Sequence, residues 1–246
     1  MDFYSILSKY YEEIFPLSIE SLDFVMKRVP SESSLLDAGC GTGGMVRQLR
    51  QQGIQAKGFD LDESMIYEAD IRLAEELTGI EKDENPVFKP GNLTDMTQLY
   101  SLECFDAVIC LGNTLIHIPF NLQFQFLQDA AKLLNTRGTL ILQILNYTNI
   151  LDEGMTFPLI ETEHCRFKRH YEPGASDGML SFVTELEEKK TGRLFENSIL
   201  HYPMMPETLM AALSMSGYAE WDTYGSYQEV SAGSGQLPLI VTAQLE

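Results

Sequence analysis

Apolar and polar residues alternate along the first 146 positions in blocks that predict strands and helices in turn. Short apolar runs typical of strands are separated by stretches with an apolar residue every three or four positions, which is the spacing of a helix with one buried face. The expected strands cover 34–38, 55–60, 86–89, 105–111 and 138–145, and the expected helices cover 43–52, 63–77, 95–100 and 120–134. This alternation predicts right-handed crossovers and a mostly parallel α/β sheet with helices on both faces.

The pattern changes after Asn146, where β-rich segments follow one another without helices between them. These segments cover 157–172, 179–189 and 194–202. The turn dipeptides Pro173-Gly174, Asp177-Gly178 and Thr191-Gly192 punctuate them, so we expect an antiparallel meander. A helix over 206–216 and two strands over 218–224 and 237–244 are then expected to return the chain to the main sheet.

These changes divide the chain into three parts. Residues 1–30 predict an N-terminal lid of two helices, broken at Phe15-Pro16, with Ser18 as the N-cap of the second helix. Residues 31–146 and 203–246 predict one cofactor-binding domain. Residues 147–202 predict an inserted antiparallel meander that covers the site of a second substrate.

Composition and charge narrow the class of partner. The 246 residues include 17 basic and 36 acidic side chains, for a formal charge of −19, which disfavours nucleic acid and anionic membranes as partners. The basic cluster of Arg166, Lys168 and Arg169 is interpreted as one solvated strand face. The four cysteines form no paired motif, and the N-terminus resembles no secretory signal, so we expect reduced thiols and a cytoplasmic protein.

The run LLDAGCGTGG at 35–44 carries the sharpest chemical information. Apolar residues end a strand there, and Gly39, Gly41 and Gly43 permit a tight turn into a helix. The glycines also fit a dinucleotide fingerprint, but a carboxylate at Asp37 would repel a pyrophosphate. S-adenosyl-L-methionine has no phosphate and carries an ammonium and a sulfonium group, so the charge pattern favours it.

A second acidic residue follows at the end of the next strand. Asp60 lies 21 residues after Gly39, at the position where an open α/β sheet presents a carboxylate to the two hydroxyls of a ribose. Leu61 and Met65 are positioned to flank the adenine.

Four ordered stretches, LLDAGCGTGG, GFDLDESMI, GNLTD and FDAVICLGNTLIHI, resemble the motifs of class I S-adenosylmethionine-dependent methyltransferases. The resemblance covers about residues 30–146 and implies a Rossmann-like, doubly wound sheet. It implies that the glycine turn holds the methionine part, Asp60 the ribose, and Asn92-Leu93 the adenine. The fourth stretch is similar to that of glycine N-methyltransferases and related enzymes, which suggests a small-molecule acceptor, with an amine favoured.

The predicted site therefore has a donor part and an acceptor part. The residues expected to bind the cofactor are Asp37, Gly39, Cys40, Gly41, Gly43, Asp60, Leu61, Met65, Asn92, Leu93, Leu111, Gly112 and Asn113. His117 and Tyr11 are the candidate catalytic residues, and the expected product of the cofactor is S-adenosyl-L-homocysteine. The histidines show no metal-ligand spacing, so no metal site is expected. A non-catalytic donor-binding protein and an NAD(P)-dependent oxidoreductase remain as alternatives.

Overall fold

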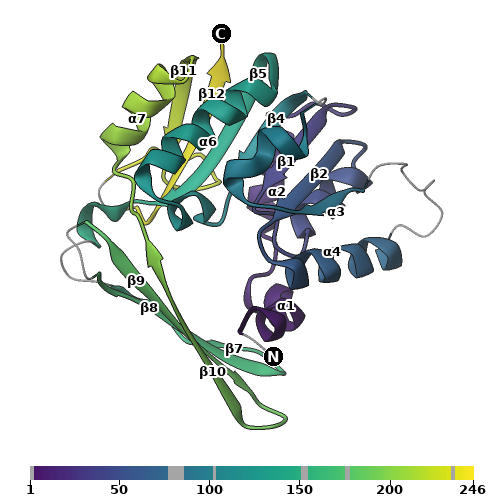
Figure 1. The fold of residues 1–246 in the computed structure, drawn as a ribbon, viewed down its shortest axis with the longest axis vertical. Helices are drawn as coiled ribbons and strands as arrows, with labels where there is room; N and C mark the ends of the chain where they lie inside the picture. Colours follow the sequence, from purple (N-terminus) through teal and green to yellow (C-terminus); the bar gives the residue numbers. More distant parts are fainter. Residues whose placement is uncertain (1–2, 77–85, 102–103, 151–154, 175–177, 234–235) are drawn as a thin grey trace.

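A central sheet of seven strands organises the molecule (Figure 1). The computed structural model describes residues 3–76, 86–101, 104–150, 155–174, 178–233 and 236–246. Within them the strand order is β11-β12-β5-β4-β1-β2-β3. The strands are β1 (Ser34–Ala38), β2 (Gln55–Asp60), β3 (Phe88–Pro90), β4 (Phe105–Cys110), β5 (Leu134–Leu145), β11 (Tyr218–Tyr224) and β12 (Pro238–Leu245).

The strands from β5 to β3 pair in parallel, and β12 pairs antiparallel with both β5 and β11. The strand order reverses between β1 and β4, which is where such sheets open a crevice at the carboxyl ends of the strands. The predicted mostly parallel sheet is thus confirmed, and the two last strands do return to it.

Helices cover both faces of this sheet and bury two separate apolar layers. One layer contains residues of α5, α6 and α7, and the other contains residues of α2, α3 and α4. Neighbouring positions on β1 divide between them, since Leu36 packs in the first layer and Leu35 in the second. The helices are α1 (Phe3–Ile14), α2 (Ile19–Met26), α3 (Gly44–Gln51), α4 (Glu63–Glu76), α5 (Met96–Leu99), α6 (Phe120–Leu133) and α7 (Pro206–Met215), with 3-10 turns η1 (Leu93–Asp95), η2 (Thr114–His117) and η3 (Tyr147–Asn149).

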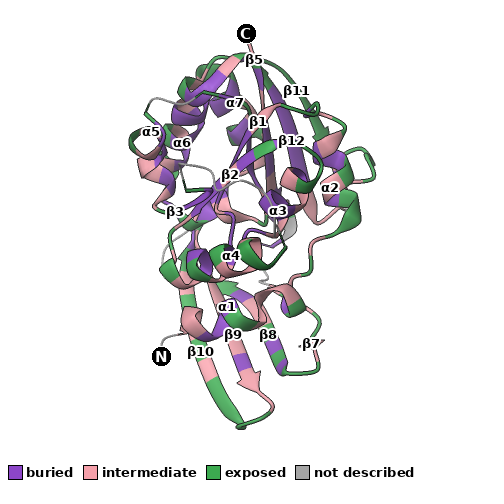
Figure 2. Ribbon diagram, turned by 90° about the vertical axis from the view of Figure 1, so that its right-hand side faces the viewer, coloured by how far each residue is buried: buried purple, intermediate pink, exposed green. Residues whose placement is uncertain are grey.

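A second, antiparallel sheet extends away from the first and meets the lid helix α1 (Figure 1). Its strands are β6 (Met155–Thr156), β7 (Ile160–Glu161), β8 (Cys165–Pro173), β9 (Leu180–Glu188) and β10 (Arg193–His201). Buried and more exposed positions alternate along β8 (Figure 2), because successive strand residues point to opposite faces. A small cluster of apolar residues from α1, α4 and this sheet joins the lid to the meander.

Two expected elements differ from the observed ones. The strand predicted over 157–172 is divided into β7 and β8, because the chain turns between them, where the Thr162 amide donates to the Cys165 carbonyl. Pro158, which has no N–H to continue a ladder, lies between β6 and β7. The strand predicted over 138–145 begins at Leu134, which pairs with Phe105 before an irregularity shifts the register so that Ala107 pairs with Thr139. No helix in the described part of the chain is long and apolar enough to span a bilayer.

Candidate cofactor and acceptor site

The glycine turn after β1 is fastened to the end of β2 by hydrogen bonds. The amides of Gly39 and Cys40 both donate to the Phe59 carbonyl, at 2.8 and 3.0 Å. The Gly41 amide donates to Oδ2 of Asp60 at 2.9 Å, and the Asp62 amide donates to Oδ1 of Asp60 at 3.0 Å. The Asp60 carboxylate predicted for the ribose therefore lies directly beside the glycine turn, and its oxygens keep further lone pairs for a ligand.

The three glycines of the turn have positive φ angles but serve different surroundings. A Cβ on Gly41 (φ +54°) would lie 3.1 Å from the Tyr11 ring, whereas one on Gly43 (φ +75°) would lie 2.4 Å from the ring of Phe88. Gly41 thus faces the lid helix and Gly43 faces β3. The structure does not bring Gly43 to the cavity described next, although its backbone starts α3.

A cavity of about 550 Å³ opens between the glycine turn, the link from α1 to α2, and the end of β4. Its size is in the range usual for small-molecule sites. The predicted residues that line it are Tyr11, Asp37, Gly39, Cys40, Leu111 and Gly112. Six of the residues predicted from sequence are therefore brought together by the fold.

The charge of this cavity is negative and uncompensated. The Asp37 side chain is buried, and none of the ion pairs of the described residues includes it. Burial, and secondarily the nearby Asp60, raises the pKa of Asp37 to about 7. Burial also raises the pKa of Asp60, against hydrogen bonds from backbone amides that lower it. Arg47, which also lines the cavity, pairs with Glu12 and Glu76 instead. A buried and a half-buried carboxyl group without an ion pair among the described residues fit a ligand that carries positive charge, as the ammonium and sulfonium of S-adenosylmethionine do.

The other predicted cofactor residues lie outside the lining of this cavity. Leu61 is 70% exposed, while Met65 and Leu93 are buried in apolar clusters. Asn92 caps η1, since its Oδ1 accepts from the Thr94 amide at 3.2 Å. Their contacts with adenine stay predictions.

Asn113 joins a buried polar cluster that links the two sheets. Its Nδ2 donates to the hydroxyls of Tyr147 at 2.7 Å and Tyr171 at 3.0 Å, and its Oδ1 accepts from the Leu145 amide. The Tyr171 hydroxyl lies 3.0 Å from Nδ1 of His201. Asn113 thus positions Tyr147 of η3 and Tyr171 of the second sheet, a role that its place in a sequence motif did not reveal.

His117, a candidate catalytic residue, packs on this cluster. Its ring centroid lies 4.3 Å from that of His201, which is buried and whose Nε2 has no hydrogen-bond partner among the described residues. His117 keeps solvent contact, and the protein packed around its ring lowers its pKa to about 4. It is therefore neutral at neutral pH and a weaker base than an ordinary histidine.

Tyr11, the other candidate, lines the cavity, but its phenol is suited to donate a hydrogen bond and not to accept a proton. Burial, followed by the charges of Asp60 and Asp37, raises its pKa above the ordinary value for a tyrosine. The phenol is thus protonated at neutral pH. Its neighbour Tyr10 points elsewhere, donating to Glu188 at 2.7 Å and stacking on His164.

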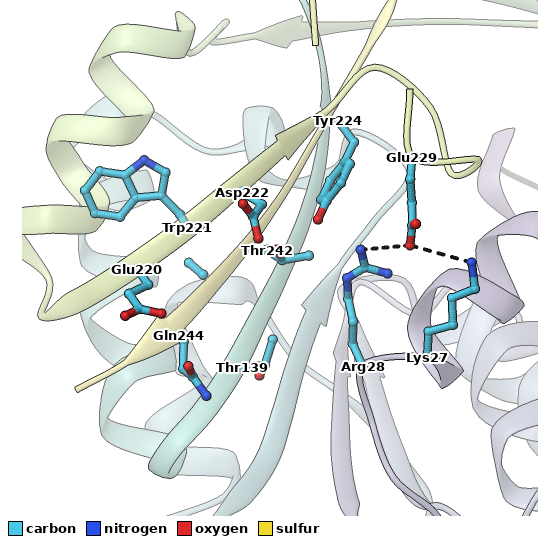
Figure 3. A pocket seen from close by; sticks show the side chains of 11 residues that line it. Lys27, Arg28, Thr139, Glu220, Trp221, Asp222, Tyr224, Glu229, Thr242 and Gln244 are labelled. Atoms are coloured by element: carbon cyan, nitrogen blue, oxygen red, sulfur yellow. Dashed lines mark hydrogen bonds and ion pairs between the residues drawn. The ribbon is translucent and has the colours of Figure 1, made fainter. Parts of the chain in front are cut away.

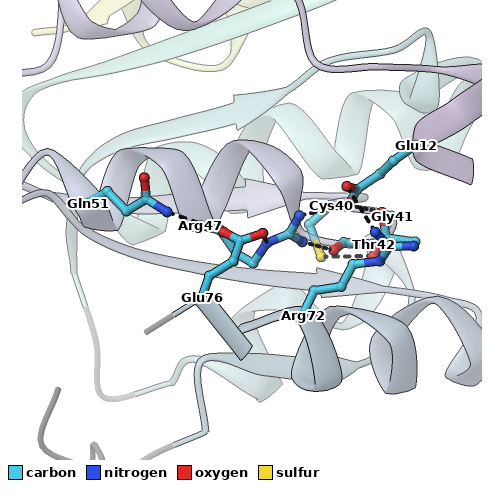
Figure 4. A network of polar contacts seen from close by, with 8 residues as sticks. All are labelled: Glu12, Cys40, Gly41, Thr42, Arg47, Gln51, Arg72 and Glu76. Atoms are coloured by element: carbon cyan, nitrogen blue, oxygen red, sulfur yellow. Dashed lines mark hydrogen bonds and ion pairs between the residues drawn. The ribbon is translucent and has the colours of Figure 1, made fainter. Parts of the chain in front are cut away.

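A network of charges ties the lid helix to the glycine turn (Figure 4). Buried Arg47 of α3 pairs with Glu12 of α1 at 2.8 Å and with Glu76 of α4 at 2.9 Å. Glu12 also accepts from the Thr42 hydroxyl at 2.9 Å and pairs with Arg72 at 3.2 Å. Glu12 therefore ties α1 to the edge of the cavity, and the sequence patterns gave no sign of this because its partners come from two other helices and a turn.

Two further cavity residues come from segments without a motif. Phe15 ends the lid segment, and Tyr227 belongs to the stretch between β11 and β12, where it packs edge-on against Phe24. The Gly225 amide donates to the Val230 carbonyl, which folds this stretch back on itself. No local periodicity marks either residue, so sequence reasoning missed both.

Another hollow, of about 470 Å³, lies along the edge strand β11 (Figure 3). It is lined by Trp221, Asp222 and Gln244, together with Lys27 and Arg28, which pair with Glu229. None of the motif residues faces it. The predicted site and this hollow are separate.

The basic cluster on β8 is divided between the two faces of its strand. Arg166 and Lys168 lie on the outer face and pair with glutamates, whereas Arg169 shares the inner face with buried Phe167 and Tyr171. The interpretation of all three as one solvated face was wrong, because adjacent strand residues point in opposite directions.

Comparison with known proteins agrees with this geometry. Residues 35–138 match the model of a methyltransferase domain. The chain is 29% identical over 204 residues to a glycine/sarcosine N-methyltransferase of Aphanothece halophytica, covering 79% of this chain and 69% of that protein. It is 31% identical over 133 residues to a glycine N-methyltransferase of Mus musculus, covering 50% of this chain but 44% of that protein.

A solved structure shares the fold over nearly the whole length. An S-adenosylmethionine-dependent methyltransferase from Clostridium acetobutylicum superposes with a TM-score of 0.80 at 15% identity, covering 98% of each chain. The meander and the lid are thus parts of a fold already seen with the parallel sheet.

Proposed function

Since this chain belongs to the class I S-adenosylmethionine-dependent methyltransferase family, we propose that it transfers a methyl group directly to a small-molecule acceptor, with an amine nitrogen as the favoured nucleophile. S-adenosylmethionine is the cofactor. The observation that supports a cationic donor most directly is the buried, unpaired carboxyl of Asp37 in the cavity. The names of the relatives, which include glycine and sarcosine, support an amine.

In this proposal the donor is bound by residues that line the cavity and by Asp60, which lies outside that lining but beside the glycine turn. Asp60 holds the ribose hydroxyls, while Asp37 and the glycine turn face the positively charged methionine part. The donor supplies a methyl group that is already activated by its sulfonium. The protein must orient the acceptor and exclude water, and orientation alone contributes on the order of 7–11 kcal/mol.

An amine must be neutral when it attacks, and the product must lose a proton. We assign the role of proton acceptor to His117 because its ring keeps solvent contact at the junction of the two sheets and is neutral at neutral pH, while its lowered pKa makes it a weaker base than an ordinary histidine. Tyr11 suits a hydrogen-bond donor instead, since its phenol stays protonated. Both roles are proposals about these side chains.

Two measurements test the proposal. Calorimetric titration of the full chain with S-adenosylmethionine and, separately, with NADH should show binding of the first only; the reverse would make the protein an oxidoreductase. Incubation with S-adenosylmethionine and a panel of amines, phenols and carboxylates should then release S-adenosylhomocysteine with at least one acceptor class. Donor binding without turnover on any of them would favour a non-catalytic sensor of the donor.

A further inference from the structure

The inner face of the antiparallel sheet carries one polar row among apolar ones. Strand register places Arg169 of β8 beside Thr184 of β9, and Thr184 beside Asn197 of β10. The rows on either side are apolar or aromatic, and they consist of Phe167, Leu186 and Phe195 on one side and Tyr171, Phe182 and Ile199 on the other. Polar groups on an inward face need partners. The Thr184 hydroxyl donates to the Asn197 carbonyl at 3.4 Å, and the Asn197 side chain hydrogen-bonds Tyr4, so Arg169 is the member of the row that calls for an explanation.

Arg169 has no carboxylate partner among the residues that the structure describes. Its guanidinium carbon lies 5.3 Å from the ring centroid of Phe15 and 4.8 Å from that of Phe157, and its Nη1 is fully buried without a hydrogen bond. The two basic residues on the outer face, Arg166 and Lys168, are both paired with glutamates. In a chain with 36 acidic and 17 basic residues, an unpaired guanidinium is unusual.

A guanidinium cannot relieve this situation by losing its proton. Arginine stays charged in proteins, and a half-buried charge without a partner is costly. The flanking rings of Phe15 and Phe157 offset part of that cost by cation–π contact. They leave the planar fork of hydrogen-bond donors, which matches an oxyanion, without an acceptor.

The position of Arg169 relates it to the proposed methyl transfer. Phe15, on which it stacks, lines the donor cavity, and Tyr171, two residues along the same strand face, belongs to the cluster with Asn113 and His201. The side chain thus lies between the wall of the donor cavity and the polar cluster that carries His117. A group bound by Arg169 lies on the meander side of Phe15, next to the donor cavity.

We propose that Arg169 binds an oxyanion on the methyl acceptor, a carboxylate or a phosphate. This inference rests on the proposed function and adds the chemical class of the acceptor. One arginine balances one negative charge, and the carboxyl groups of Asp37 and Asp60 at the donor end would repel a second. The acceptor then extends from Arg169 on the meander, which binds its anion, to the donor cavity, where its nucleophile meets the methyl group.

The binding test uses the full chain saturated with S-adenosylhomocysteine and follows its melting temperature during titration with sodium acetate or inorganic phosphate, at constant ionic strength set with sodium chloride. Acetate or phosphate should raise the melting temperature of the parent. Arg169→Gln should weaken that response about tenfold to a hundredfold in concentration. The matched control is Lys168→Gln, the adjacent exposed cation on the other face, which should respond as the parent does.

Turnover gives a second readout with paired acceptors, of which one member of each pair carries the anion. The pairs are β-alanine with β-alaninamide, and phosphoethanolamine with ethanolamine, assayed by S-adenosylhomocysteine release. A preference for β-alanine over β-alaninamide identifies a carboxylate, and a preference for phosphoethanolamine over ethanolamine identifies a phosphate. Arg169→Gln should abolish either preference. Arg169→Lys, which keeps the charge but not the fork, should recover part of it.

Several outcomes would overturn the inference. The first is that neither acetate nor phosphate raises the melting temperature of the parent. The second is that Lys168→Gln and Arg169→Gln lose this rise equally. The third is that Arg169→Gln, or Arg169→Lys if the first variant does not fold, keeps the rise of the parent. Failure of S-adenosylhomocysteine to stabilise the parent would instead count against the proposed function, because the anion titration can also be run on the free protein.

Discussion

The parallel sheet and the antiparallel meander hold side chains of opposite charge away from solvent. The parallel sheet buries Asp37 and half-buries Asp60, whereas the inner face of the meander half-buries Arg169. Among the described residues Asp37 has no ion-pair partner and Arg169 has no carboxylate partner, and each would be costly alone. In our proposal a ligand completes each side, the cationic donor at Asp37 and an anionic acceptor at Arg169.

The strongest way to break the comparison is to close the donor side sterically. Gly41→Val should weaken S-adenosylmethionine binding more than about a hundredfold, because the side chain would press on Tyr11 and strain a backbone at φ +54°. Gly53→Val is the matched control, since Gly53 also has a positive φ (+85°) but has open space around it. Calorimetry should show normal donor affinity for the control, and equal losses in both variants would mean that strain alone is responsible.

Removing the proton acceptor should affect turnover and not donor binding. His117→Ala should lower kcat about a hundredfold, as is usual for loss of a general base, while the dissociation constant of S-adenosylhomocysteine stays unchanged. The control is His164→Ala. His164 is an exposed histidine of the meander that pairs with Glu13 of α1. Added imidazole should restore activity to His117→Ala; a variant that turns over normally would rule out this role.

The ribose contact is expected to have a smaller effect. Asp60→Ala should weaken donor binding about tenfold to a hundredfold, because loss of a charged acceptor costs about 1.5–3 kcal/mol. Asp62→Ala is the control: Asp62 accepts from the amides of Ser64 and Met65 at the start of α4, so its loss should lower stability by about 1 kcal/mol and leave donor affinity intact. Donor affinity unchanged in Asp60→Ala would refute the ribose assignment.

The donor side was predictable from sequence because its parts are local. A strand, a glycine turn and a helix follow one another within ten residues, and parallel neighbouring strands necessarily bring Asp60 to the same edge as Gly39. The two lid helices and the Ser18 cap were likewise encoded locally.

The polar cluster around Asn113 and the inner face of the meander depend on strand register and on contacts between distant residues. A single sequence does not specify either of these. Asn113 meets Tyr171 only because the second sheet folds back on the first, and the polar row exists only because Arg169, Thr184 and Asn197 fall in register on three strands. The basic letters around 166–169 indicated a solvated face, and only the alternation observed on β8 separates Arg169 from its neighbours.

The titration of Asp37 gives the smallest expected effect. It should change donor affinity and protein stability in opposite directions as the pH rises. With a pKa of about 7 in the free protein, Asp37 is largely protonated at pH 6 and ionised at pH 8. A cationic donor prefers the ionised form, so its dissociation constant should rise about tenfold from pH 8 to pH 6, and this dependence should be absent in Asp37→Asn. Calorimetry at both pH values checks this, and a pH-independent affinity of the parent would refute it.

Stability should change in the other direction. The folded-state pKa of Asp37 is raised above its unfolded value of about 4, so the folded protein binds the extra proton between about pH 4 and pH 7 and loses stability as pH rises through that window. Asp37→Asn removes this cost and should raise the free energy of unfolding of the free protein at pH 8, by an amount on the order of 1–4 kcal/mol, while weakening the donor. Urea unfolding at pH 5 and pH 8 measures it. A variant less stable than the parent at pH 8 would mean that Asp37 has a stabilising partner, and the donor side would then not need a cation to complete it.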